Sequence, residues 1–284
     1  MHSKSLNKTD LLFNLSNLLK LNEIENFEEE SQIMIAYAGS REKFIDVKFN
    51  KINENILDSI VKERLKGKPL SKIIRQKGFW KNIFITDENT LDPRADSEII
   101  IENILNDLSS SKIKDHFFID ICCGSGCLGI SILDEFNKSS CDFIDISEKA
   151  ISVCKKNISK IKVESQSSTY ISDLFSKYPI ERLLRANFLI CNPPYIPTNN
   201  YYNLDNQTLY DPKIALDGGE DGIIYYVKIL NYLKKVKFTG DIFFEIDPII
   251  INNLEKFLLE KSLKIVYKKT DYRNLDRVIK ITFP

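Results

Sequence analysis

Residues 117–129 read FFIDICCGSGCLG, and this stretch decides the fold. The apolar run FFIDICC is typical of a parallel strand that is buried on both faces of a sheet. Gly124, Gly126 and Gly129 follow it with the spacing GxGxxG, which predicts a tight turn that opens a helix. A strand, a glycine turn and a helix in this order indicate the nucleoside-binding unit of a doubly wound α/β domain.

The sequence beyond this stretch continues the alternation of strands and helices. We expect further helices near 127–136, 148–157, 222–235 and 249–260, and strands near 141–146, 187–191, 242–246, 263–268 and 277–282. This alternation predicts a parallel, doubly wound sheet that binds its ligands at the C-terminal ends of the strands.

The N-terminal part of the chain has a different, helical pattern. Leucines at helical spacing between Leu11 and Leu19 predict a first helix behind Thr9, and residues 27–38 and 53–65 predict two more. We therefore expect a small helical domain over 1–80 and an α/β domain over 81–284. Residues 81–115 would form a connecting hairpin and a lead-in helix.

Charge within the helical part is uneven. Eight Lys or Arg residues lie between Lys62 and Lys81, against the single acid Glu63. Such a run suits a solvated helix face, or a surface for an acidic or nucleic-acid partner. The formal net charge of the whole chain is zero, which argues against a dedicated nucleic-acid coat protein.

Cysteine and histidine usage excludes several kinds of site. All six cysteines lie between Cys122 and Cys191 without a CxxC pair, so we expect reduced thiols in a cytoplasmic protein. His2 and His116 are the only histidines, which argues against His-ligated zinc and Ser-His-Asp triads. Residues 1–21 predict an amphipathic helix and not a signal peptide. No apolar run reaches the roughly 18–20 residues that cross a bilayer.

Two acids accompany the glycine turn. Asp145 ends the next strand, 21 residues after Gly124, where a carboxylate can accept hydrogen bonds from ribose hydroxyls. Asp120 would repel a pyrophosphate but would favour the ammonium and sulfonium groups of S-adenosylmethionine. The alternative interpretations are a simple tight turn at Gly124 and Gly126, and an ordinary N-terminal cap at Asp145.

A second motif, Asn192-Pro193-Pro194-Tyr195, directly follows the predicted strand 187–191. The Asn192 carboxamide oxygen and the Pro193 carbonyl can each accept one hydrogen of a planar NH2 group. The prolines hold these acceptors in place, and Tyr195 offers a flat face to the acceptor group. The motif therefore favours methyl transfer to an amide or base nitrogen, without a metal or a covalent nucleophile. The alternative interpretation is a structural one, in which the two prolines form a rigid turn and Tyr195 only packs against its neighbours.

With both motifs in place, the chain resembles the PrmC/HemK family. These proteins are protein-(glutamine-N5) methyltransferases that modify the glutamine of the GGQ motif in peptide-chain release factors. The resemblance covers nearly the whole chain and is carried by PLSKIIRQKGFW (69–80), LDPRADSE (91–98), DICCGSG (120–126), IDIS (144–147), SDLF (172–175), NPPYI (192–196), ALDGGEDG (215–222) and FFEI (243–246).

The resemblance implies a class I, Rossmann-like methyltransferase domain behind a helical domain that grips the release factor, with the basic stretch 62–81 as a candidate contact. It implies a cytoplasmic monomer that converts S-adenosylmethionine to S-adenosylhomocysteine without a metal, a membrane or direct nucleic-acid binding. By position, the cofactor contacts fall on Asp120, Cys122, Cys123, Gly124, Ser125, Gly126, Asp145, Leu174 and Asn192. Substrate contacts fall on Asn192, Pro193, Pro194 and Tyr195, of which Asn192, Pro193 and Tyr195 would serve catalysis.

Four positions depart from the family pattern. Cys122 stands where the first glycine of the turn is usual, and Ala95 replaces the second proline of the PRPDTE signature. Leu174 stands where some members have an aromatic residue beside adenine. Asp247-Pro248 stands where a glycine is usual.

Three other functions remain open at this point. N6-adenine DNA methyltransferases and some rRNA base methyltransferases share NPPY, although residues 86–284 carry 25 Lys/Arg and 29 Asp/Glu and so lack a strongly basic balance. A nicotinamide dehydrogenase is disfavoured by Asp120 and by NPPY. A non-catalytic adaptor is conceivable because Cys122 alters the cofactor turn.

Overall fold

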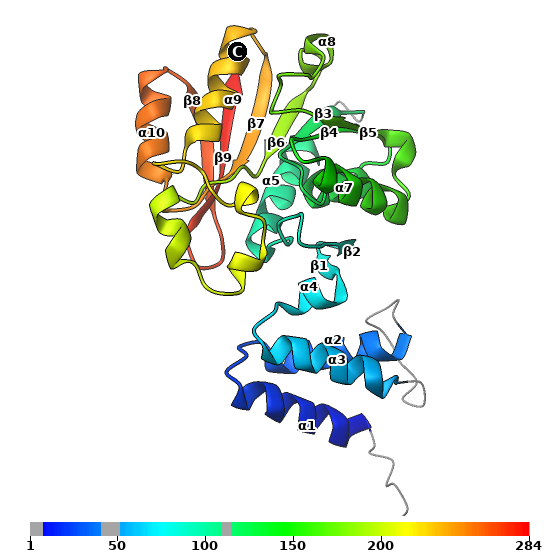
Figure 1. Cartoon of the computed structure of the whole chain (residues 1–284). Coiled ribbons are helices and arrows are strands. Elements are labelled where there is room, and N and C mark those ends of the chain that lie inside the picture. The colour runs from blue at the N-terminus through cyan, green and yellow to red at the C-terminus, as the bar shows by residue number, and fades with distance from the viewer. Residues whose placement is uncertain (1–7, 41–51, 110–114, 284) are drawn as a thin grey trace, which may run out of the picture. The chain divides into compact units, whose positions relative to one another are not determined.

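The computed structural model describes residues 8–40, 52–109 and 115–283 (Figure 1). Residues 1–7 of the predicted N-terminal helix lie outside the described residues. The chain divides into two compact units between Arg75 and Gln76. This division precedes residue 80, because Gln76–Phe79 already forms the first strand, β1, of a hairpin in the second unit.

Four helices make up the N-terminal unit: α1 (Lys8–Leu21), α2 (Phe27–Ser40), α3 (Glu54–Leu65) and α4 (Leu70–Ile74). The three predicted helices are confirmed, although Thr9 lies inside α1 and so does not cap it. Asn53 caps α3, since its side chain accepts a hydrogen bond from the Ile56 N–H at 3.2 Å. Apolar side chains of all four helices form one core around the fully buried Leu19 and Met34.

The second unit begins with the hairpin of β1 and β2 (Asn82–Ile85). A hairpin was predicted within 81–115, but its first strand begins earlier, at Gln76. Helix α5 (Glu98–Ser109) leads into a seven-stranded sheet with the order β5-β4-β3-β6-β7-β9-β8. Its strands are β3 (Phe117–Ile121), β4 (Ser140–Asp145), β5 (Ser167–Ile171), β6 (Phe188–Cys191), β7 (Gly240–Glu245), β8 (Lys264–Thr270) and β9 (Asp276–Phe283). The helices between them are α6 (Cys127–Glu135), α7 (Glu148–Ile161), α8 (Ile180–Leu183), α9 (Ile224–Lys235) and α10 (Ile251–Glu260).

Two features of this sheet differ from the prediction. Strand β5 was not predicted, because its sequence SSTYI is polar and only partly buried at the edge of the sheet. The sheet is mostly parallel rather than parallel throughout, since β9 runs antiparallel to both β7 and β8. Residues 271–275 connect β8 to β9, and this link is too short for the crossover that a parallel pair needs.

Each face of the sheet carries its own apolar core, because successive strand side chains point to opposite faces. Ile119 and Ile121 of β3 face α9 and α10 in one cluster, whereas Phe118 faces α5, α6 and α7 in the other. Figure 1 shows these two groups of helices around the sheet. Helices on both faces of a mostly parallel sheet form a doubly wound, class I methyltransferase-like architecture.

The chain reverses its direction across the sheet beside β3. From β3 it moves outward through β4 to β5, and it then returns to β6 on the other side of β3. Ligands of open α/β sheets bind at the carboxyl ends of the strands at such a switch point. Among the described residues, no helix is long and apolar enough to cross a membrane.

Candidate functional site

Four neighbouring strands end at the same level on the carboxyl edge of the sheet. Ile121 pairs with Ile144 and with Cys191, and Cys191 pairs with Phe244. The residues that follow these in the chain are Asp145 on β4, Cys122 after β3, Asn192 after β6 and Glu245 on β7. The register therefore sets these four residues in one row across the switch point.

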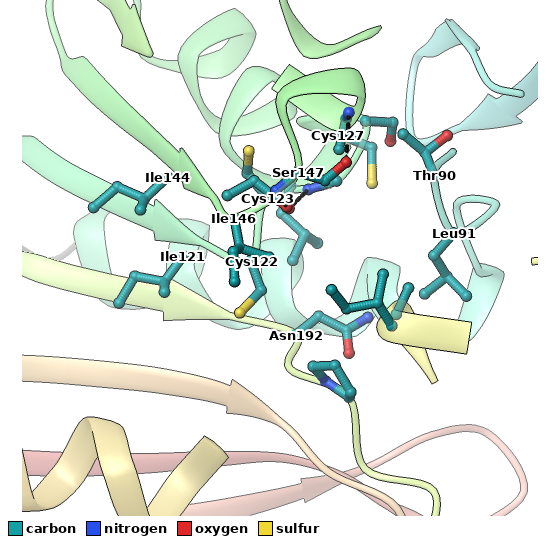
Figure 2. Close-up of a pocket in the computed structure, with 18 of the residues that line it drawn as sticks. Thr90, Leu91, Ile121, Cys122, Cys123, Cys127, Ile144, Ile146, Ser147 and Asn192 are labelled. Atoms are coloured by element: carbon teal, nitrogen blue, oxygen red, sulfur yellow. Dashed lines mark hydrogen bonds between the residues drawn. The ribbon is translucent and has the colours of Figure 1, made fainter. Parts of the chain in front are cut away.

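A cavity lies over the β4, β3 and β6 part of this row (Figure 2). Eight of the predicted site residues line it: Cys122, Cys123, Gly124, Ser125, Asp145, Leu174, Asn192 and Pro194. In Figure 2 the Asn192 side chain extends from the end of β6 toward the side of the cavity that Leu91 borders. Figure 2 shows Thr90 and Leu91, from the loop before α5, across the cavity from Cys122 and Cys123.

Asp145 ties the turn after β3 to the end of β4. Its Oδ2 accepts a hydrogen bond from the Gly124 N–H at 2.9 Å, and its Oδ1 accepts one from the Ser147 N–H at 2.9 Å. Burial raises the pKa of the Asp145 carboxyl, and the two backbone N–H groups oppose this rise. Ser147, and not Asp145, is the N-cap of α7. The Asp145 carboxylate keeps lone pairs for hydroxyl donors in the cavity.

Two predicted cofactor residues do not line the cavity: Asp120, which lies beneath the glycine turn, and Gly126, at the end of that turn. Asp120 is 1 % exposed, and its Oδ2 accepts a hydrogen bond from the Gly129 N–H at 2.9 Å. Burial raises the pKa of Asp120 to about 7. Gly126 has a φ of 78°, and a Cβ there would lie 2.6 Å from the Cys154 Sγ. Both residues shape the turn from behind.

The structure accommodates the non-glycine residue Cys122 in the turn. Its φ of 57° is in the left-handed region that favours glycine. Its half-buried side chain borders the cavity and packs against the apolar core that contains Cys191. Leu174 also has a positive φ, of 48°, and lines the same cavity. Both unusual residues therefore contribute apolar surface to the cavity wall.

A second cavity adjoins the first, and Asn192 borders both. Tyr195 lines only the second cavity, and Pro193 is buried without lining either. The other lining residues come from distant parts of the chain: Leu91, Arg94, Asp96, Ile196, Leu204, Thr208, Ala215, Leu216, Glu245, Asp247 and Arg277. The tetrapeptide Asn192–Tyr195 thus stands between two cavities.

Backbone contacts hold this tetrapeptide from the side of residues 215–222. The Ile196 N–H donates to the Leu216 carbonyl at 2.9 Å, and the Gly218 N–H donates to the Ile196 carbonyl at 2.8 Å. A Cβ at Gly218 would lie 2.7 Å from the Tyr195 Cα, so only glycine fits there. The ALDGGEDG segment is therefore the support of the NPPY turn.

Sequence reasoning assigned no role to several residues of this site. Arg94 forms an ion pair with Asp211 at 2.6 Å, and the Asp92 N–H donates to the same carboxylate at 3.1 Å. Asn157 donates to the Ser125 carbonyl at 2.9 Å and so ties α7 to the glycine turn. Arg94 lies in the segment LDPRADSE and Glu245 in FFEI. A charged residue in a tight loop, or at the end of an otherwise apolar strand, was the feature of the sequence that could have marked each of them as a site residue.

Comparisons with known proteins agree on the kind of domain. Residues 88–228 match the family model described as the methyltransferase small domain. The release factor glutamine methyltransferase of Mycoplasma mycoides subsp. mycoides SC is 32% identical over 237 residues, which span 81% of this chain and 82% of that protein. The enzyme of the same name from Clostridium acetobutylicum is 31% identical over 277 residues, which span 95% of this chain and 96% of that protein.

Similarity to solved structures concerns the fold. The hMettl16 catalytic domain in complex with MAT2A 3′UTR hairpin 6 superposes with a TM-score of 0.55 at 15% identity, covering 71% of this chain and 75% of that chain. All residues that line the first cavity lie within 88–228, the stretch that the family model matches, whereas Glu245, Asp247 and Arg277 of the second cavity lie after it.

Proposed function

Because the chain belongs to the family of release factor glutamine methyltransferases, we propose that it methylates the side-chain N5 of the GGQ glutamine in peptide-chain release factors, as a cytoplasmic monomer. The chain is an S-adenosylmethionine-dependent methyltransferase. The observation that carries the proposal is the place of Asn192, which borders both cavities. A methyl donor in the first cavity and an amide in the second would meet at this residue.

The first cavity fits S-adenosylmethionine. Asp145 offers carboxylate lone pairs at the end of β4, where ribose hydroxyls can donate. Leu174 and Ile146 offer apolar surface for a base, and Cys122 to Ser125 form a backbone-lined turn beside them. Asp120 lies behind this turn, so its charge would act on the cationic cofactor through the turn and not by contact.

When bound, S-adenosylmethionine supplies an electrophilic methyl group on a sulfonium sulfur. The Asn192 carboxamide oxygen would accept one N–H group of the glutamine amide. The Pro193 carbonyl is proposed as the acceptor of the other N–H group, although Pro193 is buried and lines neither cavity in this structure. This pair of acceptors keeps electron density on the nitrogen and directs its lone pair toward the first cavity. Tyr195, on the side of the second cavity, would hold the amide plane.

The substrate is tested by methyl transfer from labelled S-adenosylmethionine to three acceptors in parallel. These are an intact release factor, its variant with alanine in place of the GGQ glutamine, and duplex DNA. We expect label on the release factor alone, and none on the variant. Label on DNA alone would assign the site to adenine methylation instead.

Replacing Asp145 by alanine is expected to weaken cofactor binding by about tenfold to a hundredfold, because hydrogen bonds to a charged acceptor contribute about 1.5–3 kcal/mol. Isothermal titration with S-adenosylhomocysteine measures the affinity, and kcat at saturating cofactor should fall much less. Glu148→Ala is the matched control, since Glu148 is exposed in the first turn of α7 and does not line the cavity. An unchanged affinity in Asp145→Ala contradicts the assignment.

The helical unit is proposed to dock the release factor through the exposed part of the basic stretch. Arg64 is buried against Glu30, with 2.6 Å between Nε and Oε2, and Lys72 is also buried. These two cations are therefore not available to a partner. Lys62 and Arg75 are exposed, and Lys68 is half-buried.

Reversing the charges of Lys62, Lys68 and Arg75 to glutamate is expected to raise KM for an intact release factor about tenfold, because it replaces attraction by repulsion at the docking surface. KM for a short GGQ peptide and the cofactor affinity should stay within about twofold. Reversal of Lys155 and Lys256, which are exposed on the catalytic unit, is the control. Equal losses on protein and peptide would refute the docking role.

A further inference from the structure

Strand β7 brings a buried carboxylate to the second cavity that the mechanism above does not use. Glu245 is the last residue of β7 and is 2 % exposed. The pairing of Cys191 with Phe244 sets Glu245 level with Asn192 on the neighbouring strand. Neighbouring strands lie about 4.8 Å apart, and both Glu245 and the proposed amide acceptor Asn192 line the second cavity.

The hydrogen bonds of this carboxylate are incomplete. The Tyr195 hydroxyl donates to its Oε1 at 3.4 Å, a long hydrogen bond. Among the described residues, no group donates a hydrogen bond of good geometry to its Oε2, although the Ser97 side chain is near enough to lower the pKa of Glu245. Burial raises the pKa of Tyr195 well above its usual value, and the nearby Glu245 charge adds to this, so the hydroxyl keeps its proton and donates. A buried carboxylate with one long hydrogen bond destabilises the fold, which calls for a role in function.

We propose that Glu245 is a positioning residue for the methyl-accepting amide: its ionised carboxylate orients the Tyr195 hydroxyl, and hence the ring beside the amide, and its charge favours the transition state. This inference rests on the proposed function. As the amide nitrogen forms the new C–N bond, the C–S bond breaks with its electron pair on sulfur. The nitrogen carries positive charge until one of its protons leaves to water. A negative charge one strand away stabilises that positive charge.

Burial, together with the charged and polar groups around Glu245, makes its ionisation sensitive to pH near neutrality. Burial raises the pKa of Glu245 to about 7, Asp96 also raises it, and Ser97, Arg277 and Tyr195 lower it. Arg277 is itself held by Asp247 at 2.7 Å and by Asp96 at 3.2 Å, so it only partly neutralises the carboxylate. The ionised fraction of Glu245 then rises from about one tenth at pH 6 to about nine tenths at pH 8.

Stability and activity should respond to pH in opposite directions. The folded chain binds the Glu245 proton more tightly than the unfolded chain does, so the fold loses stability as pH rises from about 4.5, the ordinary glutamate pKa, to about 7. Glu245→Gln removes this charge and is expected to raise Tm by a few degrees at pH 8 and by much less at pH 5. A purely structural carboxylate would instead lower Tm when it is replaced.

The experiment measures kcat and KM for a GGQ peptide from pH 6 to 8.5 at saturating cofactor, together with Tm at pH 5 and 8. The wild-type kcat should rise about tenfold between pH 6 and 8. Glu245→Gln should lose this slope and stay at least tenfold below the wild type at pH 8, with unchanged cofactor affinity. Tyr195→Phe should have a similar defect, and the double variant should be no slower than the slower single variant.

Glu148→Gln is the control for the slope, because Glu148 is an exposed carboxyl of α7 that lines neither cavity. This variant should keep the rise of kcat with pH. Three results for Glu245→Gln would each overturn this inference and leave the proposed function intact: a retained rise of kcat with pH, wild-type activity at pH 8, or a lowered Tm at pH 8. A wild type that methylates no release factor at any pH would overturn the proposed function, and this inference with it.

Discussion

Replacing Asn192 by alanine is expected to lower kcat for release factor methylation by about 10²–10³, since it removes a preorganised acceptor from the reacting amide. Asn192 is half-buried at the end of β6, where the two cavities meet. Its carboxamide is therefore well placed to hold the glutamine amide in the second cavity close to a methyl donor in the first. Steady-state kinetics with an intact release factor measures the loss.

Two controls separate this effect from damage to the fold. Asn192→Ala should keep its Tm within a few degrees of the wild type and should bind S-adenosylhomocysteine within about tenfold, because Asp145 and the glycine turn remain. Asn199→Ala removes an exposed asparagine from the same loop and should change kcat by less than about twofold. Near-full activity of Asn192→Ala would remove Asn192 from the proposed mechanism.

Replacing Gly218 by alanine is expected to lower kcat about a hundredfold, although Gly218 is outside the NPPY turn. The added Cβ would lie 2.7 Å from the Tyr195 Cα and 2.8 Å from both the Pro194 and Gly222 carbonyl oxygens. All three neighbours are backbone atoms, so no side-chain rotation can relieve the overlap. The NPPY turn must shift, and a displacement of about 1 Å at a reacting group can lower the rate about 10²-fold.

Gly78→Ala is the matched control for this variant. Gly78 lies in strand β1, and a Cβ there would meet no atom within 4 Å. Its kcat should equal that of the wild type, whereas overpacking at Gly218 should also lower the free energy of unfolding by about 1–3 kcal/mol. Cofactor affinity, measured by titration, should change little in either variant. Full turnover in Gly218→Ala would show that the turn tolerates movement.

Much of the site was predictable because its residues directly follow predicted strands. Parallel strands present their carboxyl ends at one edge, so Cys122, Asp145 and Asn192 were expected to meet there, and the register sets them in one row. Strand β5 was missed because an exposed edge strand such as Ser167–Ile171 lacks the apolar run of a buried one. The strand at 277–282 was predicted and is β9, but its antiparallel direction was missed because direction leaves no trace in the composition of a single strand.

The roles of Asp120 and Glu245 could not be predicted, because both depend on which side of the sheet edge each carboxylate faces. Asp120 is the residue before the last one of β3, and its carboxylate lies beneath the glycine turn, where it accepts a hydrogen bond from the Gly129 N–H. Glu245 reaches the second cavity only because β7 lies beside β6, 50 residues after Tyr195 in sequence. Contacts between residues so far apart follow from strand order, and local sequence does not encode strand order.

The sequence by itself determined the class of the fold, the glycine turn, the NPPY turn and the family, because each depends on short-range patterns of residue type and spacing. The tertiary structure alone decided that Asn192 borders two cavities and that Gly218 supports the NPPY turn. It also decided that Arg64 and Lys72 are buried within the basic stretch. These facts depend on which distant segments pack together, and packing is set by the whole core.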